Sequence, residues 1–137
     1  MVIENKENLG YTGGNNVGTR WALDQEADYV LILNNDTRLD EEMVSRLVVV
    51  MEADATIGVT GPMVYHEDEP GMIQSAGGRL DDRWRSWHEG ANEVDRGQYA
   101  RPRQVDWLSG CALMLRTETI RAIGMLDERF FCYWEEV

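Results

Sequence analysis

The stretch that decides the fold is Tyr29-Val30-Leu31-Ile32-Leu33-Asn34-Asn35-Asp36. Its first five residues form a continuous apolar run, which is typical of a strand that is buried on both faces of a parallel sheet. The run ends abruptly at two asparagines and an aspartate, residue types that favour turns. We therefore predict a buried strand over residues 29–33 that ends in a polar turn.

Strand and helix patterns alternate on both sides of this strand. Before it, residues 2–4 predict a short strand, residues 8–16 a glycine-rich loop and residues 15–26 a helix. After it, Asp40 can cap an amphipathic helix, and residues 57–60 predict another strand. This β-α-β-α-β order predicts an α/β fold with a mostly parallel sheet flanked by helices.

The second half of the chain has a different pattern. Residues 63–106 contain short strand and turn signals with nearly balanced charges, which predict a solvated surface insertion. Residues 105–108 and 111–115 are expected to be strand segments. Thr117 can cap a short helix that Gly124 terminates.

Length and charge limit the classes of function. The chain has 137 residues, a hydrophobic fraction of 43% and a formal net charge of −12, so we expect one folded domain. This charge argues against nucleic acid and anionic membrane surfaces as partners. An anionic ligand remains compatible if a metal ion or backbone amides supply the positive charge.

Cys111 and Cys132 match no zinc or redox spacing, which favours reduced thiols and a cytoplasmic location. The N-terminus carries no apolar signal core. The longest apolar runs have about five residues, against the roughly 20 that a membrane-spanning helix needs. We therefore expect no membrane span in this segment.

Two polar loops are candidate ligand sites. A carboxylate in Asn34-Asn35-Asp36 can ligate a hard divalent cation whose shell a diphosphate completes, although a plain turn explains the same residues. The glycines of residues 10–16 can let the backbone approach a phosphate at a helix start, or form an ordinary loop. Neither a P-loop nor a dinucleotide fingerprint is present.

Two further stretches carry candidate chemistry. Glu135-Glu136 follows several aromatic residues, which suits a general base of raised proton affinity, although a solvated acidic end is the alternative. Trp107-Leu108-Ser109-Gly110-Cys111 can form the floor of a sugar site or pack in the core. His66 and His88 are isolated, and we interpret both as surface residues.

Together and in this order, these features resemble the family 2 inverting glycosyltransferases with the glycosyltransferase-A fold, and among them the rhamnosyltransferase-like branch. The matching segments are Asn8 to Gly18, Leu33-Asn34-Asn35-Asp36-Thr37, Ser109-Gly110-Cys111 and Phe130 to Val137. The resemblance implies transfer of a sugar from a nucleotide diphosphate donor, a dTDP- or UDP-sugar, to a glycan or lipid-linked glycan hydroxyl. It also implies polysaccharide or cell-surface glycan synthesis in the cytoplasm or at the inner face of the membrane.

The resemblance assigns roles to individual residues. Asp36 would ligate Mn²⁺ or Mg²⁺, with Asn34 and Asn35 near the ribose and sugar. Glu136, beside Glu135, would be the base. Asn8, Gly10 and Gly14 match the donor loop, and Trp107, Ser109 and Gly110 match the acceptor loop, so residues 1–62 form a donor side and 63–137 an acceptor side of one catalytic domain.

Relatives of this type begin with further strands and continue past the base. We therefore expect a catalytic domain truncated at both ends, whose sheet lacks its first strands. The alternatives are a sugar nucleotidyltransferase and a fragment that binds a nucleotide-sugar without catalysis.

Overall fold

The computed structural model describes residues 1–133. Along this part of the chain lie α1 (Gly10–Asp24), β1 (Tyr29–Leu33), α2 (Met43–Ala53), β2 (Val59–Thr60), β3 (Val64–Tyr65), β4 (Ile73–Ser75), β5 (Gly78–Leu80), β6 (Ser86–His88), β7 (Ala112–Arg116) and α3 (Thr117–Ile123). The protein is thus a mixed α/β structure, and the strand over residues 29–33 has the predicted bounds. The predicted burial on both faces is wrong, because only Ile32 of this strand is buried and, among the described residues, β1 lies at the edge of its sheet.

The central sheet has three strands in the order β1-β7-β2. β7 runs antiparallel to both neighbours, with Leu31 opposite Met114 and Val59 opposite Leu115. β1 and β2 therefore point the same way but do not touch. The predicted mostly parallel sheet is not found, since every strand pair among residues 1–133 is antiparallel. β7, a strand from the second half of the chain, lies between β1 and β2.

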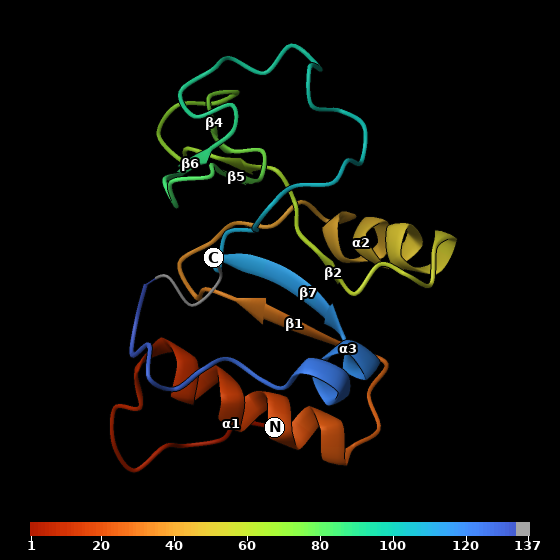
Figure 1. Ribbon diagram of the computed structural model, residues 1–137, viewed down its shortest axis with the longest axis vertical. Coiled ribbons are helices and arrows are strands. Elements are labelled where there is room, and N and C mark those ends of the chain that lie inside the picture. The colour runs from red at the N-terminus through yellow and green to blue at the C-terminus, as the bar shows by residue number, and fades with distance from the viewer. Residues whose placement is uncertain (134–137) are drawn as a thin grey trace.

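Helices surround this sheet. Figure 1 shows α1 beside β1, α2 beside β2 and α3 following β7. The apolar stripe of α2 supplies Met43, Leu47 and Met51, which are buried against Met114 of β7. Burial of such side chains is worth about 1.5–3 kcal/mol each, so this cluster is the main apolar core of the sheet.

The start of α1 differs from the prediction. The glycine-rich stretch expected as a loop is helical from Gly10 onward, and residues 2–4 form no strand. The Asn8 side chain accepts a hydrogen bond from the Gly10 N–H (2.9 Å), and the Tyr11 N–H donates to the Phe131 carbonyl (2.8 Å). These partners satisfy N–H groups that a helix start leaves free. Because Phe131 is distant in sequence, the local pattern gave no sign of this.

Buried polar residues of α1 fix the helix on the segment 126–130. The Asn16 amide donates to the Leu126 carbonyl (2.8 Å) and accepts from the Leu126 N–H (3.1 Å). The Thr12 hydroxyl donates to the Phe130 carbonyl (2.6 Å). The C-terminal part of the described chain is thereby held along α1.

The other helix ends lie close to the predicted ones. The Asp40 carboxylate accepts from the Glu42 N–H (2.9 Å), and α2 begins directly afterwards. Thr117 is the first residue of α3 and not its cap, and the helix ends at Gly124, whose φ of +96° favours glycine. No helix within residues 1–133 is long and apolar enough to cross a membrane.

Residues 63–107 form a small lobe with hydrophobic contacts of its own (upper part of Figure 1). β3 pairs with β4 and β5 with β6, both antiparallel. Ile73 is fully buried and Trp107 is 8% exposed. The prediction of a merely solvated insertion is therefore wrong for these residues.

The structure also shows the contacts and exposure of the histidines and cysteines. In this lobe the His88 ring lies 2.9 Å from the Ser75 hydroxyl and edge-on to Trp107 (centroids 4.7 Å apart), and the Nε2 of His66 is buried. His88 is exposed, as predicted, although its ring has these two contacts, whereas His66 is half-buried and the prediction of a surface residue is wrong for it. Cys111 is half-buried and Cys132 is exposed, and both are free thiols.

Candidate functional site

The candidate site lies at the carboxyl end of β1. Because β7 runs antiparallel, its first residues lie at this end, with Leu33 opposite Ala112. The Asn34 N–H continues the ladder by donating to the Cys111 carbonyl (2.9 Å). The structure thus brings the polar turn after β1 next to the Ser109-Gly110-Cys111 turn, as the two motifs require if they serve one site.

The side chains of Asn34-Asn35-Asp36 take no part in holding their own turn. The turn is closed by the Thr37 hydroxyl, which donates to the Asn34 carbonyl (2.8 Å). Asn34 is half-buried, and Asn35 and Asp36 are exposed. Among residues 1–133, no hydrogen bond or ion pair engages these three side chains.

Five other aspartates in turns or loops of residues 1–133 accept a hydrogen bond from the backbone N–H two residues later, the usual way in which an aspartate stabilises a turn, whereas Asp68 and Asp82 do not. The five are Asp40, Asp54, Asp81, Asp95 and Asp127. The Asp36 carboxylate makes no such bond, and it differs from those of Asp68 and Asp82 in lying just past the carboxyl end of β1, where ligands bind in α/β sheets.

The start of α1 reaches the same edge. Gly10 has a φ of +70°, and a Cβ there would lie 2.4 Å from the Phe131 carbonyl oxygen, so only glycine fits. The Tyr11 hydroxyl donates to the Gly110 carbonyl. Gly10, Gly110 and the segment 130–131 are thus joined at the edge where β1 ends, and exposed Asn8 precedes them.

The remaining predicted residues are placed as follows. Gly14 is half-buried further along α1 and lines a groove between α1 and β1. Ser109 is half-buried, and its hydroxyl faces the Cys111 N–H (3.4 Å). Trp107 packs inside the lobe, and its indole N–H donates to the Arg79 carbonyl (3.2 Å). Glu135 and Glu136 lie outside the described residues.

The possible metal ligands around Asp36 limit the kind of metal binding that this site can support. Within residues 1–133 no group of three or more His, Cys, Asp and Glu side chains is arranged to hold an ion. Mg²⁺ and Mn²⁺ are commonly bound through one or two carboxylates, substrate phosphates and water. A single carboxylate beside two amides therefore fits a metal that arrives with a phosphorylated ligand, and does not fit a permanently held ion.

Comparison with known proteins identifies the family. Residues 1–123 match the family described as glycosyl transferase family 2. The chain belongs to this family. The resemblance inferred from the motifs is thereby confirmed at the level of the family.

Individual relatives agree with this assignment. The chain is 29% identical over 138 residues to the low-salt glycan biosynthesis hexosyltransferase Agl10 of Haloferax volcanii, covering 98% of this chain and 43% of that protein. It is 27% identical over 137 residues to the galactofuranosyltransferase GlfT1 of Mycobacterium tuberculosis, with the same coverage of both chains. The chain thus spans less than half the length of these relatives.

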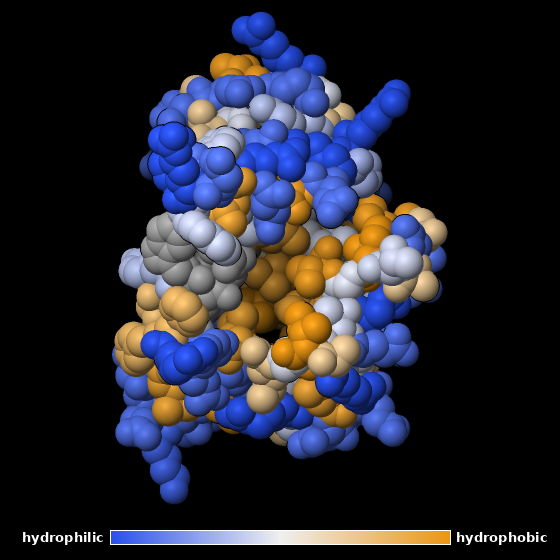
Figure 2. Space-filling view, in the orientation of Figure 1, coloured by the Kyte–Doolittle hydropathy of each residue, from blue (hydrophilic) through white to orange (hydrophobic). Residues whose placement is uncertain are grey.

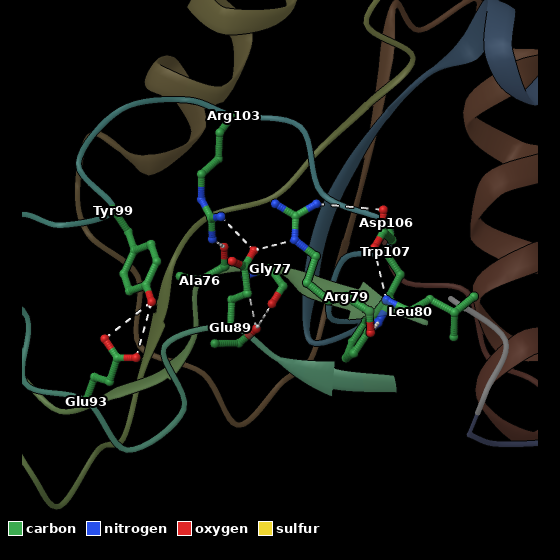
Figure 3. Close-up of polar contacts among 11 residues, drawn as sticks. Ala76, Gly77, Arg79, Leu80, Glu89, Glu93, Tyr99, Arg103, Asp106 and Trp107 are labelled. Carbon is green, nitrogen blue, oxygen red and sulfur yellow. Dashed lines mark hydrogen bonds and ion pairs between the residues drawn. The ribbon is translucent and has the colours of Figure 1, made fainter. Parts of the chain in front are cut away.

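This family 2 glycosyltransferase chain also contains a charged cluster that sequence reasoning missed (Figure 3). The Glu89 carboxylate lies between two arginines, 2.9 Å from the Arg79 Nε and 2.6 Å from an Arg103 Nη. Arg103 also donates to the Ala76 carbonyl (2.8 Å), and Arg79 lies 3.7 Å from Asp106. We call Arg79, Glu89, Arg103 and Asp106 the clamp.

The clamp fixes the chain that leads into the acceptor-side turn. It joins β5 and the residue after β6 to residues 103–106, and the Asp106 carboxylate accepts from the Leu80 N–H (2.9 Å). Directly after Asp106, the 107–110 segment leads to β7, which begins at Ala112. The six arginines interspersed among nine acidic residues in 63–106 were the available signal, since mixed charges accompany ion pairing as well as solvation.

Proposed function

We propose that this chain is the sugar-transferring part of an enzyme that uses a nucleotide diphosphate sugar and inverts the anomeric carbon. The observation that carries the proposal is the Asn34-Asn35-Asp36 turn at the carboxyl end of β1, whose side chains no described residue engages, in a chain of glycosyl transferase family 2. In α/β sheets, ligands bind beyond such strand ends. The family supports a glycosyltransferase-A arrangement over a sugar nucleotidyltransferase.

In this proposal the donor occupies the edge between α1 and the polar turn. Asp36 holds Mn²⁺ or Mg²⁺ together with the donor diphosphate, and Asn34 and Asn35 contact the ribose and sugar. The ion supplies positive charge that stabilises the leaving diphosphate, which a chain of net charge −12 otherwise lacks. Asn8, Gly10 and Gly14 line the nucleotide side, where Gly10 permits close approach of the backbone.

The acceptor approaches from the side of Ser109 and Gly110, with Trp107 supporting that turn from within the lobe. Glu136, with Glu135 beside it, accepts the proton of the acceptor hydroxyl. The oxygen of that hydroxyl attacks the anomeric carbon while the bond from this carbon to the diphosphate breaks. The contact of Phe131 with Gly10 supports this assignment of the base. It brings residues 130–131, which lie shortly before Glu135 in the sequence, to the edge of the sheet.

The names of the relatives bear on the sugar. The names hexosyltransferase and galactofuranosyltransferase support a hexose as the transferred sugar, and rhamnose stays compatible with the motifs. UDP or dTDP as the carrier nucleotide rests on the motif resemblance alone. We propose synthesis of a polysaccharide or cell-surface glycan, on a glycan or lipid-linked glycan acceptor, in the cytoplasm or at its membrane face.

Calorimetric titration of UDP and dTDP with and without Mn²⁺ tests the donor site. We expect binding that requires Mn²⁺ and disappears in Asp36→Ala. Asp68→Ala, an exposed carboxylate of the lobe, is the matched control and should bind as the wild type does. Equal affinity with and without Mn²⁺ would remove the metal from the proposal.

The base is tested in the full-length protein. Glu136→Gln should retain donor binding and lose transfer, since the amide cannot accept the proton. Retained transfer would move the base to Glu135 or elsewhere.

A further inference from the structure

The β5–β6 hairpin ends in an exposed tryptophan with an uncommon backbone. Trp84 is 77% exposed and has a φ of +61°, a region that bulky residues rarely adopt. Such strain persists only where the surrounding structure holds it, and it tends to occur at functional positions. The backbone conformation of Trp84 therefore makes it a candidate functional residue.

Asp81 holds the turn that presents Trp84. Its carboxylate accepts from the backbone N–H groups of Arg83 (3.0 Å) and Arg85 (2.9 Å) and from the Arg85 Nε (2.8 Å). The Trp84 N–H donates to the Asp81 carbonyl (3.0 Å). The Arg85 backbone and side-chain hydrogen bonds lower the pKa of Asp81, so the carboxylate stays charged and the turn stays formed at neutral pH. The turn that carries the Trp84 indole is thus held in place by hydrogen bonds.

The base of the hairpin is equally fixed. Trp107 packs beneath Gly78 so closely that a Cβ on Gly78 would lie 1.9 Å from the ring. On the opposite face of the hairpin, Trp87 is paired in register with Arg79, which Glu89 binds as part of the clamp. Trp87 is 50% exposed, so the hairpin carries a second accessible indole beside a guanidinium group.

The surroundings of these indoles indicate the chemistry of a partner. Figure 2 shows the lobe, in its upper part, as mainly hydrophilic, with isolated apolar areas. An apolar protein partner or a membrane needs a broader apolar face, and the net charge of −12 disfavours anionic lipid. Sugars present apolar C–H faces that suit aromatic rings and hydroxyl groups that suit arginine.

The hairpin also has a defined relation to the candidate site. The Gly78 N–H donates to the Trp107 carbonyl (2.8 Å), and the Gly78 carbonyl accepts from the Asp106 N–H (3.0 Å). The chain then runs from Trp107 through Ser109 and Gly110 into β7. In Figure 1 the lobe lies over the end of the sheet where β1 ends and β7 begins.

We propose that the tip of the β5–β6 hairpin is a saccharide-binding subsite, in which Trp84 stacks against a sugar ring of the acceptor chain at a distance from the transferred residue. The assignment of that saccharide as acceptor rests on the proposed function. Binding of a saccharide by the hairpin does not depend on catalysis and is tested separately.

A glycan array of linear hexose oligosaccharides of two to eight residues, probed with the labelled 137-residue chain, tests binding. We expect the wild type to bind the longer members. Trp84→Gly should weaken this binding about tenfold while keeping or raising the melting temperature, because glycine accepts the positive φ without strain. Trp21→Ala, an exposed tryptophan on α1, is the control and should bind unchanged.

Three results would overturn the proposal: a wild type that binds no oligosaccharide, a Trp84→Gly variant that binds as well as the wild type, or wild-type binding to phosphatidylglycerol vesicles that Trp84→Gly abolishes. The last result would assign the hairpin to a membrane.

Transfer assays on the full-length protein separate this inference from the proposed function. With the longest oligosaccharide bound on the array as acceptor, Trp84→Gly should raise the acceptor KM about tenfold and leave the donor KM unchanged. With a disaccharide acceptor, the variant and the wild type should be alike. Absence of transfer by the wild type refutes the proposed function alone, whereas transfer with an unchanged acceptor KM in the variant refutes the acceptor subsite.

Discussion

Gly78→Ala tests how the lobe supports the acceptor-side turn. The added Cβ would lie 1.9 Å, 2.1 Å and 2.3 Å from three atoms of the Trp107 indole, whereas real Cβ contacts do not fall below 3.0 Å. The ring must therefore move by about 1 Å or more. Because Trp107 is 8% exposed and packed against His88, the movement has to displace its neighbours as well.

The expected cost follows from two effects. Forcing a carbon atom into a closely packed site destabilises by about 1–3 kcal/mol. Displacement of the indole also breaks its hydrogen bond to the Arg79 carbonyl, which contributes about 1 kcal/mol. We expect Gly78→Ala to lower the free energy of unfolding by about 3 kcal/mol.

Urea denaturation followed by far-ultraviolet circular dichroism measures this change. Gly18→Ala is the matched control, because a Cβ at that helical glycine meets no atom within 4 Å. It should raise stability by about 0.5–1 kcal/mol through its better helix propensity. If Gly78→Ala unfolds at the same urea concentration as the wild type, the packing of Trp107 on Gly78 is not as described and the support of the 107–110 segment fails with it.

Three further changes probe other contacts. Asn16→Ala should cost about 2–3 kcal/mol in thermal unfolding, because it leaves the Leu126 N–H and carbonyl without partners, and an unchanged midpoint would contradict this. Burial and the Asp95 hydrogen bond raise the pKa of Tyr65 to about 12, so absorbance titration should show one step there that Tyr65→Phe removes. Since the unfolded pKa is about 10, the stability from this shift is present below pH 10 and lost as the pH rises through 12. Glu89→Gln should cost about 1 kcal/mol and make urea stability less sensitive to salt, and equal salt dependence in both proteins would refute the clamp.

The elements predicted well are those that local residues determine. The strand over residues 29–33 is apolar throughout and bounded by polar residues, and its predicted bounds match. The periodic apolar stripe of α2 predicted both the helix and its buried face. Gly124 ends α3 because its positive φ suits glycine. In each case the deciding chemistry lies within a few residues of the element.

The elements predicted badly depend on distant residues. Alternation of strands and helices indicates the order of elements but not which strands pair, so the insertion of β7 between β1 and β2 was not predictable. The glycine-rich residues before Asn15 become helical because Phe131 and Leu126 supply hydrogen-bond partners. Local propensity alone favours a loop there.

The same division applies to the candidate site. The motifs named residues of the right kind, and pairing of β1 with β7 explains why Asn34 and Cys111 meet. The burial of Trp107 was not evident, because its partners Gly78 and His88 come from a hairpin that the sequence presented as surface. The positions of Glu135 and Glu136 stay a prediction.

The way in which the edge of the sheet is held explains why its polar side chains are available to a ligand. The bonds that join its parts involve main-chain groups at Asn34, Gly110 and Phe131. The fold therefore obtains its stability there from the backbone and from Tyr11, and leaves the Asp36 carboxylate unengaged by the described residues. Several other turn aspartates bond to their own backbone, and Asp36 is a carboxylate that the described fold does not use at the strand end where α/β sheets bind ligands.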